Sequence, residues 1–259
     1  MLCIIVSMNS RGFTLLELIV VIAIIGVLSV IVLPSFKTAL SRANDTKLKQ
    51  FAITLDKKND ITSKYDFEEG SGLVTRDSNI YMQNNLTVPG SGANFSTDTY
   101  SSSSQYSMYF NGAARLTSTS NASPVLDNKS FSISFWFKMD STANGCMLQK
   151  GAPGVARQMV EVCYWLDSMY VGFGSGLLLS PNYKVTAQQW HHFAMSYDVS
   201  TYLVVAYVDG VRIGQFNLGG VLSNTGSSPL SVGAYPSGSY PFTGYVDDLR
   251  FYEGQVIVR

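Results

Sequence analysis

The stretch "FSISFWFKM", residues 131–139, carries a large apolar side chain at every second position. In an extended chain this period places Phe131, Ile133, Phe135 and Phe137 on one face. Such alternation is typical of a strand that packs one face against a core. The stretch therefore predicts a β-strand inside an all-β domain.

Similar segments follow it, separated by Gly, Asn, Ser and Pro: "MVEVCYWL" (159–166), "SMYVGFG" (168–174), "HHFAMSYDV" (191–199), "LVVAYVDG" (203–210) and "TGYVDDLRFY" (243–252). About a dozen such strands without intervening helices favour a two-sheet jelly-roll sandwich over residues 61–259. We expect Trp136, Trp190 and His192 in its core. Asp209 and Gly210 are expected to form a hairpin turn.

The N-terminal part of the chain has a different character. Residues 18–36 contain no charged side chain, a run long enough to cross a hydrocarbon layer of about 30 Å as a helix. Residues 37–60 continue with an imperfectly amphipathic helical pattern. The sequence therefore predicts one helix over residues 13–60, membrane-spanning at first and amphipathic afterwards.

The segment "RGFTLLELIVVIAIIGVLSVIVLP", residues 11–34, closely resembles the amino terminus of type IV pilins and type II secretion pseudopilins. The resemblance implies that a prepilin peptidase cuts after Gly12 and methylates the new amino terminus at Phe13. Residues 1–12 would then be the leader. Because this leader begins with an apolar run unusual for the family, we expect Met8 to be its true start.

The same resemblance answers why an apolar segment keeps the carboxylate of Glu17. An isolated carboxylate in lipid costs several kcal/mol unless it is paired or protonated. The family implies that Glu17 pairs with the Phe13 ammonium of a neighbouring subunit and so sets the register of a filament. Gly26 and Pro34 match the positions between which the helix loosens during assembly, consistent with their poor helix propensity.

The order of landmarks in the body of the chain is also informative. "YDFEEGSG", "YSMYFNGAARLT", "SFSISFWFKM", "QWHHFAMSYD", "YVDGVRIG" and "FTGYVDDLRFY" resemble, in this order, the concanavalin A-like or laminin G-like family in its pentraxin-related branch. The resemblance implies a fold that often binds carbohydrate or extracellular protein. It also implies a calcium site from Asp77, Asn79, Asp247 and Asp248, oxygen ligands that suit this ion. The alternative is that these residues only cap turns.

The residues do not indicate an enzyme. Glu68 and Glu69 are adjacent, as are Asp247 and Asp248, and adjacent side chains of an extended strand point to opposite faces, unlike the carboxylate pair of a glycosidase. Two neighbouring histidines, His191 and His192, supply neither a zinc site nor a convincing triad. A formal net charge of +0 gives no footprint for nucleic acid.

Cysteine usage fits an exported domain. The chain contains 3 cysteines, and Cys3 would be lost with the leader. Cys146 and Cys163 remain, on neighbouring predicted strands, and we expect them to form a disulfide. Two buried free thiols are the alternative.

A ligand site is expected in the loops at one rim of the sandwich, because loops carry function while strands satisfy the core. The segment "GAYPSGSYPF", residues 233–242, places Tyr235 and Tyr240 among small polar residues, a composition that suits sugar or protein surfaces. The alternative is that both rings merely cover the end of the core.

These features predict a minor pilin-like filament subunit that displays a lectin-like, adhesive domain. One alternative is a major structural pilin with a non-binding sandwich, and another is a type II secretion pseudopilin that contacts cargo. We expect the precursor in the inner membrane and the mature chain in an extracellular pilus filament at the cell surface. The expected partners are the prepilin peptidase, other pilins through the helix, and a glycan or extracellular protein.

Overall fold

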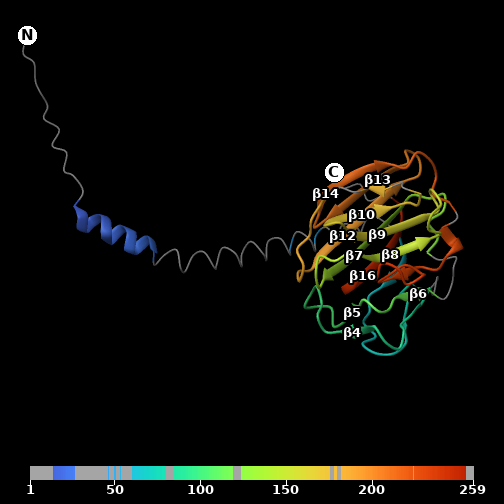
Figure 1. Ribbon diagram of the computed structural model, residues 1–259, viewed down its shortest axis with the longest axis horizontal. Coiled ribbons are helices and arrows are strands. Elements are labelled where there is room, and N and C mark those ends of the chain that lie inside the picture. The colour runs from blue at the N-terminus through green and yellow to red at the C-terminus, as the bar shows by residue number, and fades with distance from the viewer. Residues whose placement is uncertain are drawn as a thin grey trace, which may run out of the picture. The chain divides into compact units, whose positions relative to one another are not determined.

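The computed structural model describes residues 14–26, 46, 50, 53, 60–79, 84–118, 124–175, 178–179, 182–223 and 225–254 (Figure 1). They belong to two units, an N-terminal helix and a β-sandwich, which are described separately. Gly12, Phe13 and Pro34, and most of the helix expected over residues 13–60, lie outside the described residues.

The N-terminal helix covers residues 15–26 and begins with a reciprocal cap. The Thr14 backbone amide and hydroxyl donate to Glu17 Oε2, at 2.8 and 2.9 Å. The Glu17 amide in turn donates to the Thr14 hydroxyl at 3.2 Å. This is the capping box of a Thr three residues before a Glu. Glu17 therefore organises the helix start within its own chain. Within the described ranges, no helix has the length and hydropathy needed to span a bilayer.

The body of the chain forms two packed antiparallel sheets, which confirms the predicted sandwich. The first sheet has the order β14-β13-β12-β7-β16-β5-β4, with β1 added on β16, and the second has the order β11-β10-β9-β8-β15-β6-β3-β2. In Figure 1, β4 and β5 lie at one end of the sandwich and β13 and β14 at the other. The strands are β1 Asp60–Tyr65, β2 Val74–Thr75, β3 Leu86–Thr87, β4 Ala93–Ser96, β5 Ser107–Asn111, β6 Leu116–Ser118, β7 Phe131–Met139, β8 Gly145–Gly151, β9 Met159–Trp165, β10 Ser168–Gly172, β11 Leu178–Leu179, β12 His191–Asp198, β13 Leu203–Val208, β14 Val211–Asn217, β15 Ser231–Val232 and β16 Thr243–Glu253.

Strand β7 lies between β12 and β16 and follows the predicted pleat. Phe131, Ile133, Phe135 and Phe137 are all buried in the main core cluster, as their alternation predicts. The β13–β14 hairpin also forms as expected, with Asp209 and Gly210 both at positive φ, 53° and 71°. This is the conformation that a two-residue turn of this kind requires.

The expectation that Trp136, Trp190 and His192 are core residues holds for Trp136 and His192, which are 3% and 1% exposed, and is wrong for Trp190, which is only half-buried. Trp136 and His192 are buried, but they belong to the opposite pleat of β7 and β12, outside the main core cluster. On this outer face a loop covers Trp136: its residue Tyr100 stacks on the indole, with ring centroids 4.5 Å apart. Trp190 is half-buried and donates its indole N–H to Asp98 at 3.0 Å.

The predicted disulfide joins Cys146 and Cys163. The two residues are direct partners in the antiparallel register of β8 and β9, and both are buried. The bond therefore links adjacent strands of the second sheet.

Replacing both cysteines, Cys146→Ala with Cys163→Ala, is expected to lower the free energy of unfolding by about 2–4 kcal/mol, because the crosslink restricts the unfolded chain. Denaturant titration under oxidising and reducing conditions measures the loss, and reduction should have no effect on the double variant. Peptide mapping of the unreduced wild type should recover the two cysteines as one linked pair. Free alkylation of both thiols would contradict the bond.

Candidate functional site

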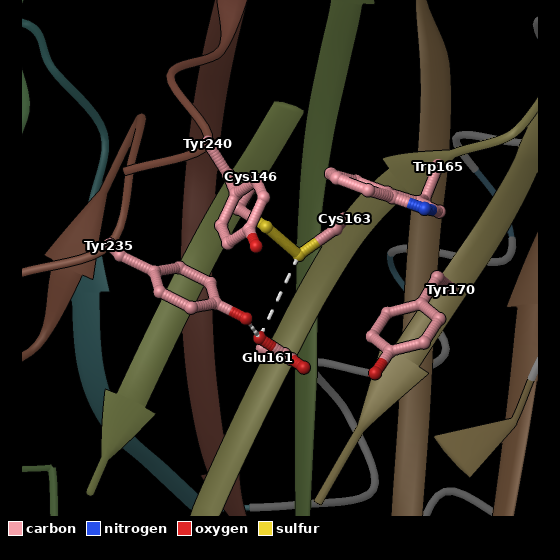
Figure 2. Close-up of a pocket in the computed structure, with 7 residues that line it drawn as sticks. All are labelled: Cys146, Glu161, Cys163, Trp165, Tyr170, Tyr235 and Tyr240. Atoms are coloured by element: carbon pink, nitrogen blue, oxygen red, sulfur yellow. Dashed lines mark hydrogen bonds between the residues drawn. A yellow bond between two sulfur atoms is a disulfide. The ribbon is translucent and has the colours of Figure 1, made fainter. Parts of the chain in front are cut away.

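A cavity of about 160 Å³ opens on the outer face of the second sheet, where the segment between β15 and β16 folds over β8, β9 and β10 (Figure 2). Its wall combines aromatic rings, one carboxylate and the disulfide. The lining residues are Cys146, Glu161, Cys163, Trp165, Tyr170, Tyr235 and Tyr240.

The pleat of β9 positions three of these side chains. Val160, Val162 and Tyr164 point into the main core, so the alternate residues Glu161, Cys163 and Trp165 point outward. The neighbouring strands add their residues by register. Cys163 pairs with Cys146 on one side and with Tyr170 on the other. Core packing on one face thus fixes the cavity floor on the other.

The two tyrosines come from a closed loop. The Tyr235 amide donates to the Ser239 carbonyl at 3.0 Å, and the Gly238 amide donates to the Tyr235 carbonyl at 2.8 Å. The loop is fastened to the sheet by the Cys146 amide, which donates to the Tyr240 carbonyl at 2.9 Å. The positions of both rings are therefore set by backbone hydrogen bonds.

Glu161 lies at the centre of the floor and is only 3% exposed. The Tyr235 hydroxyl donates to its Oε2 atom, as Figure 2 shows. Burial raises the pKa of Glu161, and hydrogen bonds from Tyr235 and Tyr170 oppose that rise. Burial also raises the pKa of Tyr170 to about 12, helped by the Glu161 charge, and raises that of Tyr235 further. Both hydroxyls therefore remain protonated donors at neutral pH.

Gly172 on β10 leaves the space that this carboxylate occupies. It is the register partner of Glu161. A Cβ atom at Gly172 would lie 2.2 Å from Glu161 Oε1 and 2.8 Å from a ring carbon of Tyr170. A glycine within a strand often marks such a close approach. Any larger residue at this position would displace the carboxylate from the floor.

Three rings form the walls beside this floor. Tyr240 meets Trp165 at a centroid distance of 4.9 Å and an interplanar angle of 80°. It meets Tyr235 at 5.0 Å and 73°. Successive rings are thus nearly perpendicular, and Tyr240 remains 44% exposed at the mouth.

The structure brings together four of the residues singled out from the sequence: Tyr235, Tyr240, Cys146 and Cys163. Their location differs from the expected one, because strands of the sheet supply most of the wall and the loop supplies only the two tyrosines. Sequence reasoning missed Glu161, Trp165 and Tyr170. The available signal was "EVCYW", whose outward positions are polar or aromatic, followed closely by Gly172.

The expected calcium residues are not brought to one cavity. Asp77 and Asn79 organise a turn: Asp77 Oδ1 accepts the Lys64 and Asn79 amides at 2.9 and 3.0 Å, and the Asn79 side chain donates to the Ile61 carbonyl at 2.9 Å. Neither lines the second cavity, of about 390 Å³, whose described walls are Lys64, Asp66, Glu68, Tyr100, Ser103, Ser104, Gln105, Asp247, Asp248 and Arg250.

Asp247 and Asp248 both line this acidic cavity, so the expectation that they face opposite sides is wrong. The cause is a β-bulge, since the register of β16 against β7 shifts between Asp247 and Arg250, and Asp248 has a φ of 50°. Asp248 is held by two hydrogen bonds from the Arg250 guanidinium, both 2.7 Å.

Asp247 has no such cation. Its Oδ2 accepts a hydrogen bond from the Ser104 hydroxyl at 3.1 Å, while its Oδ1 is buried without a hydrogen-bond partner. Burial raises the pKa of Asp247 to about 8, and the neighbouring charge of Asp248 adds to the rise. The carboxyl is therefore short of one positive or donating partner.

Other candidate chemistry is absorbed by structure. His191 Nδ1 lies 2.6 Å from Asp209 Oδ2, and its Nε2 lies 3.0 Å from the Thr186 carbonyl. Among the described residues, the cluster of three metal-ligating side chains is Cys146, Glu161 and Cys163, and the disulfide engages both sulfurs. Sγ of Cys163 lies 4.0 Å from Glu161 Oε2.

Comparison with known proteins shows two separate relationships. The model of the concanavalin A-like lectin/glucanases superfamily matches residues 118–256, and that of the prokaryotic N-terminal methylation motif matches residues 7–33. The type IV wide pilus major component PilA4 of Thermus thermophilus is 53% identical over 38 residues, which are 15% of this chain and 29% of that relative. The match thus spans less than a third of the pilin.

Solved structures share the sandwich fold. Domain 4 of AbnA, a GH43 extracellular arabinanase of Geobacillus stearothermophilus in complex with arabinotriose, has a TM-score of 0.60 at 20% identity, over 77% of this chain and 95% of that one. The binding domain of Paraclostridial Mosquitocidal Protein 1 has a TM-score of 0.57 at 14% identity, over 76% and 50%. The ligand binding domain of botulinum neurotoxin serotype D in complex with N-acetylneuraminic acid has a TM-score of 0.57 at 10% identity, over 76% and 48%.

These findings assign the two parts of the chain. The methylation motif and the short match to a pilin show that the N-terminal segment is similar to that of a type IV pilin precursor. The body of the chain matches the concanavalin A-like lectin/glucanases model over residues 118–256. The chain belongs to the concanavalin A-like lectin/glucanases superfamily and carries the N-terminal methylation motif of type IV pilins.

Proposed function

We propose that this chain is a minor pilin that displays a glycan-binding domain on a type IV pilus. The observation that carries the proposal is the cavity over β8, β9 and β10, in which aromatic walls surround hydrogen-bonding groups on a domain joined to a filament motif. Ligand sites are typically concave, largely apolar and supplied with a few well-placed polar groups. This cavity has that composition.

The cavity suits a sugar in two respects. The rings of Trp165 and Tyr240 offer apolar surface for the C–H groups of a sugar ring, at low entropic cost. Glu161 accepts hydrogen bonds from hydroxyl groups, and the hydroxyls of the half-buried Tyr170 and Tyr235 orient it. Two distant structural relatives of the sandwich were solved with arabinotriose and with N-acetylneuraminic acid. They support a sugar-binding use of this fold.

In this proposal Glu17 exchanges one partner for another when the filament assembles. Thr14 of its own chain caps it before assembly. The Phe13 ammonium, created when the peptidase cuts after Gly12, becomes its partner on a neighbouring subunit. Gly26 and Pro34 mark the helix segment that loosens as the subunit leaves the membrane. The intrachain cap keeps the carboxylate hydrogen-bonded until the ammonium of the neighbour arrives.

We also propose that the acidic cavity binds calcium, with a revised set of ligands. Asp248 is paired with Arg250, and Lys64 is paired with Asp66 at 3.2 Å, so their charges cancel. Asp247, with its unpartnered Oδ1, and Glu68 remain as carboxylates, with the Ser104 hydroxyl between them. These are hard oxygen donors of the kind that calcium prefers. Asp77 and Asn79 would support the fold of the turn instead.

If the pocket binds glycans, Tyr235→Ala with Tyr240→Ala should weaken binding at least about fivefold, because two aromatic contacts of about 0.5–1.5 kcal/mol each are lost. The full-length protein in detergent micelles is applied to a glycan array. Tyr202→Ala, which removes a half-exposed tyrosine away from the pocket, is the matched control and should bind normally. Absence of any glycan ligand, in a subunit that dominates sheared filaments, would instead indicate a major structural pilin.

Glu17→Ala should be cleaved and methylated but should be scarce in purified filaments, since the neighbouring ammonium loses its partner in lipid. Thr14→Val removes the hydroxyl of the capping box and keeps the carboxylate, so it should assemble far better. Immunoblots of sheared filaments and of membrane fractions give the ratio of assembled to membrane-bound subunit. Intact mass verifies that each mature chain begins at Phe13. Equal incorporation of Glu17→Ala and wild type would refute the pairing.

Calcium at about one hundred times its dissociation constant should raise the melting temperature by about 5–10 °C relative to chelator, since binding to the folded state adds about 2.7 kcal/mol. Asp247→Asn should abolish this shift. Asp167→Asn, a change at an exposed turn, should retain it. A shift of unchanged size in Asp247→Asn would place the ion elsewhere.

A further inference from the structure

The aromatic pocket over β8, β9 and β10 contains an acidic group but no basic one among its described lining residues. Among the described residues that line this pocket, the carboxyl group of Glu161 is the one ionisable group apart from the tyrosine hydroxyls. These lining residues include no lysine, arginine or histidine. The hydrogen bond to Glu161 Oε2 comes from a neutral phenol, Tyr235. A buried carboxylate is costly unless it is paired with opposite charge. The site therefore holds a buried acidic group that has donors but no cation.

The ring geometry favours enclosure over flat stacking. A flat platform for a neutral sugar needs one open ring face, whereas here Trp165, Tyr240 and Tyr235 meet at 80° and 73° and form adjoining walls. Figure 2 shows these rings and Tyr170 arranged around the Glu161 carboxylate. Aromatic faces attract cations electrostatically, and walls of this kind enclose ammonium groups in other proteins.

We propose that the pocket takes a sugar unit bearing a protonated primary amine, of the 2-amino-2-deoxyhexose type. This inference rests on the proposed glycan-binding function and specifies its ligand class. The ammonium lies among the rings and is paired with Glu161, while the sugar ring reaches the mouth beside Tyr240.

Size and charge restrict the ligand further. At about 160 Å³ the cavity is smaller than the roughly 300–1,000 Å³ of drug-sized pockets, so it admits one unit of a chain rather than several. Uronic and sialic acid units bring a second carboxylate next to Glu161 and are repelled. N-acetylated amino sugars fit the same ring but lose the charge, because their nitrogen is an amide.

The test compares four immobilised oligosaccharides at one ionic strength, using the full-length protein in detergent micelles. They are oligomers of glucosamine with free amines, of N-acetylglucosamine, of glucose and of galacturonate. The free-amine oligomer should bind about tenfold more tightly than the N-acetylated one, and galacturonate should bind least. Choline serves as a probe for an ammonium group without a sugar and should compete poorly.

Variants separate charge from fold. Glu161→Gln keeps an acceptor for Tyr235 and should lose about tenfold in affinity for the free-amine oligomer, with neutral oligomers changed less than about twofold. Glu253→Gln, a change at an exposed glutamate on β16, is the matched control. If Glu161→Gln does not fold, variants at the exposed Tyr240 provide the test instead. Tyr240→Phe should retain binding of the free-amine oligomer, and Tyr240→Leu should lose it.

The outcomes distinguish this inference from the function beneath it. Equal binding of amine and neutral oligomers, or unchanged amine binding in Glu161→Gln, overturns the inference and leaves glycan binding intact. Choline binding as tight as that of the amine oligomer also overturns it, in favour of a general ammonium site. Absence of binding to every oligosaccharide overturns the proposed function itself.

Discussion

Strand β9 is constrained on both of its faces, and the wall of the aromatic cavity follows from this. Val160, Val162 and Tyr164 are buried between the sheets, and their packing leaves no freedom for the strand to shift or rotate. The outward residues are fixed by the same constraint. The disulfide also joins β9 to β8. The carboxylate of Glu161 and the indole of Trp165 are therefore positioned by the inward-facing residues of β9, although they lie outside the main core themselves.

Two cavities of this domain contain a buried carboxyl group, and the two differ in how the group is accommodated. Glu161 receives hydrogen bonds from phenols and has space reserved by Gly172. Asp247 has one hydroxyl donor and one oxygen without a partner. The carboxyl group of Glu161 is thus hydrogen-bonded by neighbouring phenols, whereas one oxygen of Asp247 has no hydrogen-bond partner and burial raises its pKa to about 8.

Much of this architecture could be predicted from the sequence because it depends on local pattern. About a dozen strand-like segments, among them the alternating pattern of β7, predicted the sandwich, and Tyr235 and Tyr240 were recognisable as aromatic residues in a loop of small ones. Glu161, Trp165 and Tyr170 were not, because they become neighbours only through the register of β8, β9 and β10. The shared cavity of Asp247 and Asp248 depends on a bulge whose positive φ at a non-glycine residue no local rule predicts. Trp136 is buried as expected, but on the outer pleat of its strand, where Tyr100 from a loop stacks on it.

The pairing of β1 with β16 has a consequence for biogenesis. The residues nearest the N-terminal segment, Asp60–Tyr65, find their hydrogen-bond partners at Leu249–Glu253, near the other end of the sandwich sequence. While the ribosome is still making the domain, β1 therefore has no partner. Strand β1 can form this pairing only when synthesis has passed residue 253. The first sheet therefore cannot be completed until β16 has been synthesised.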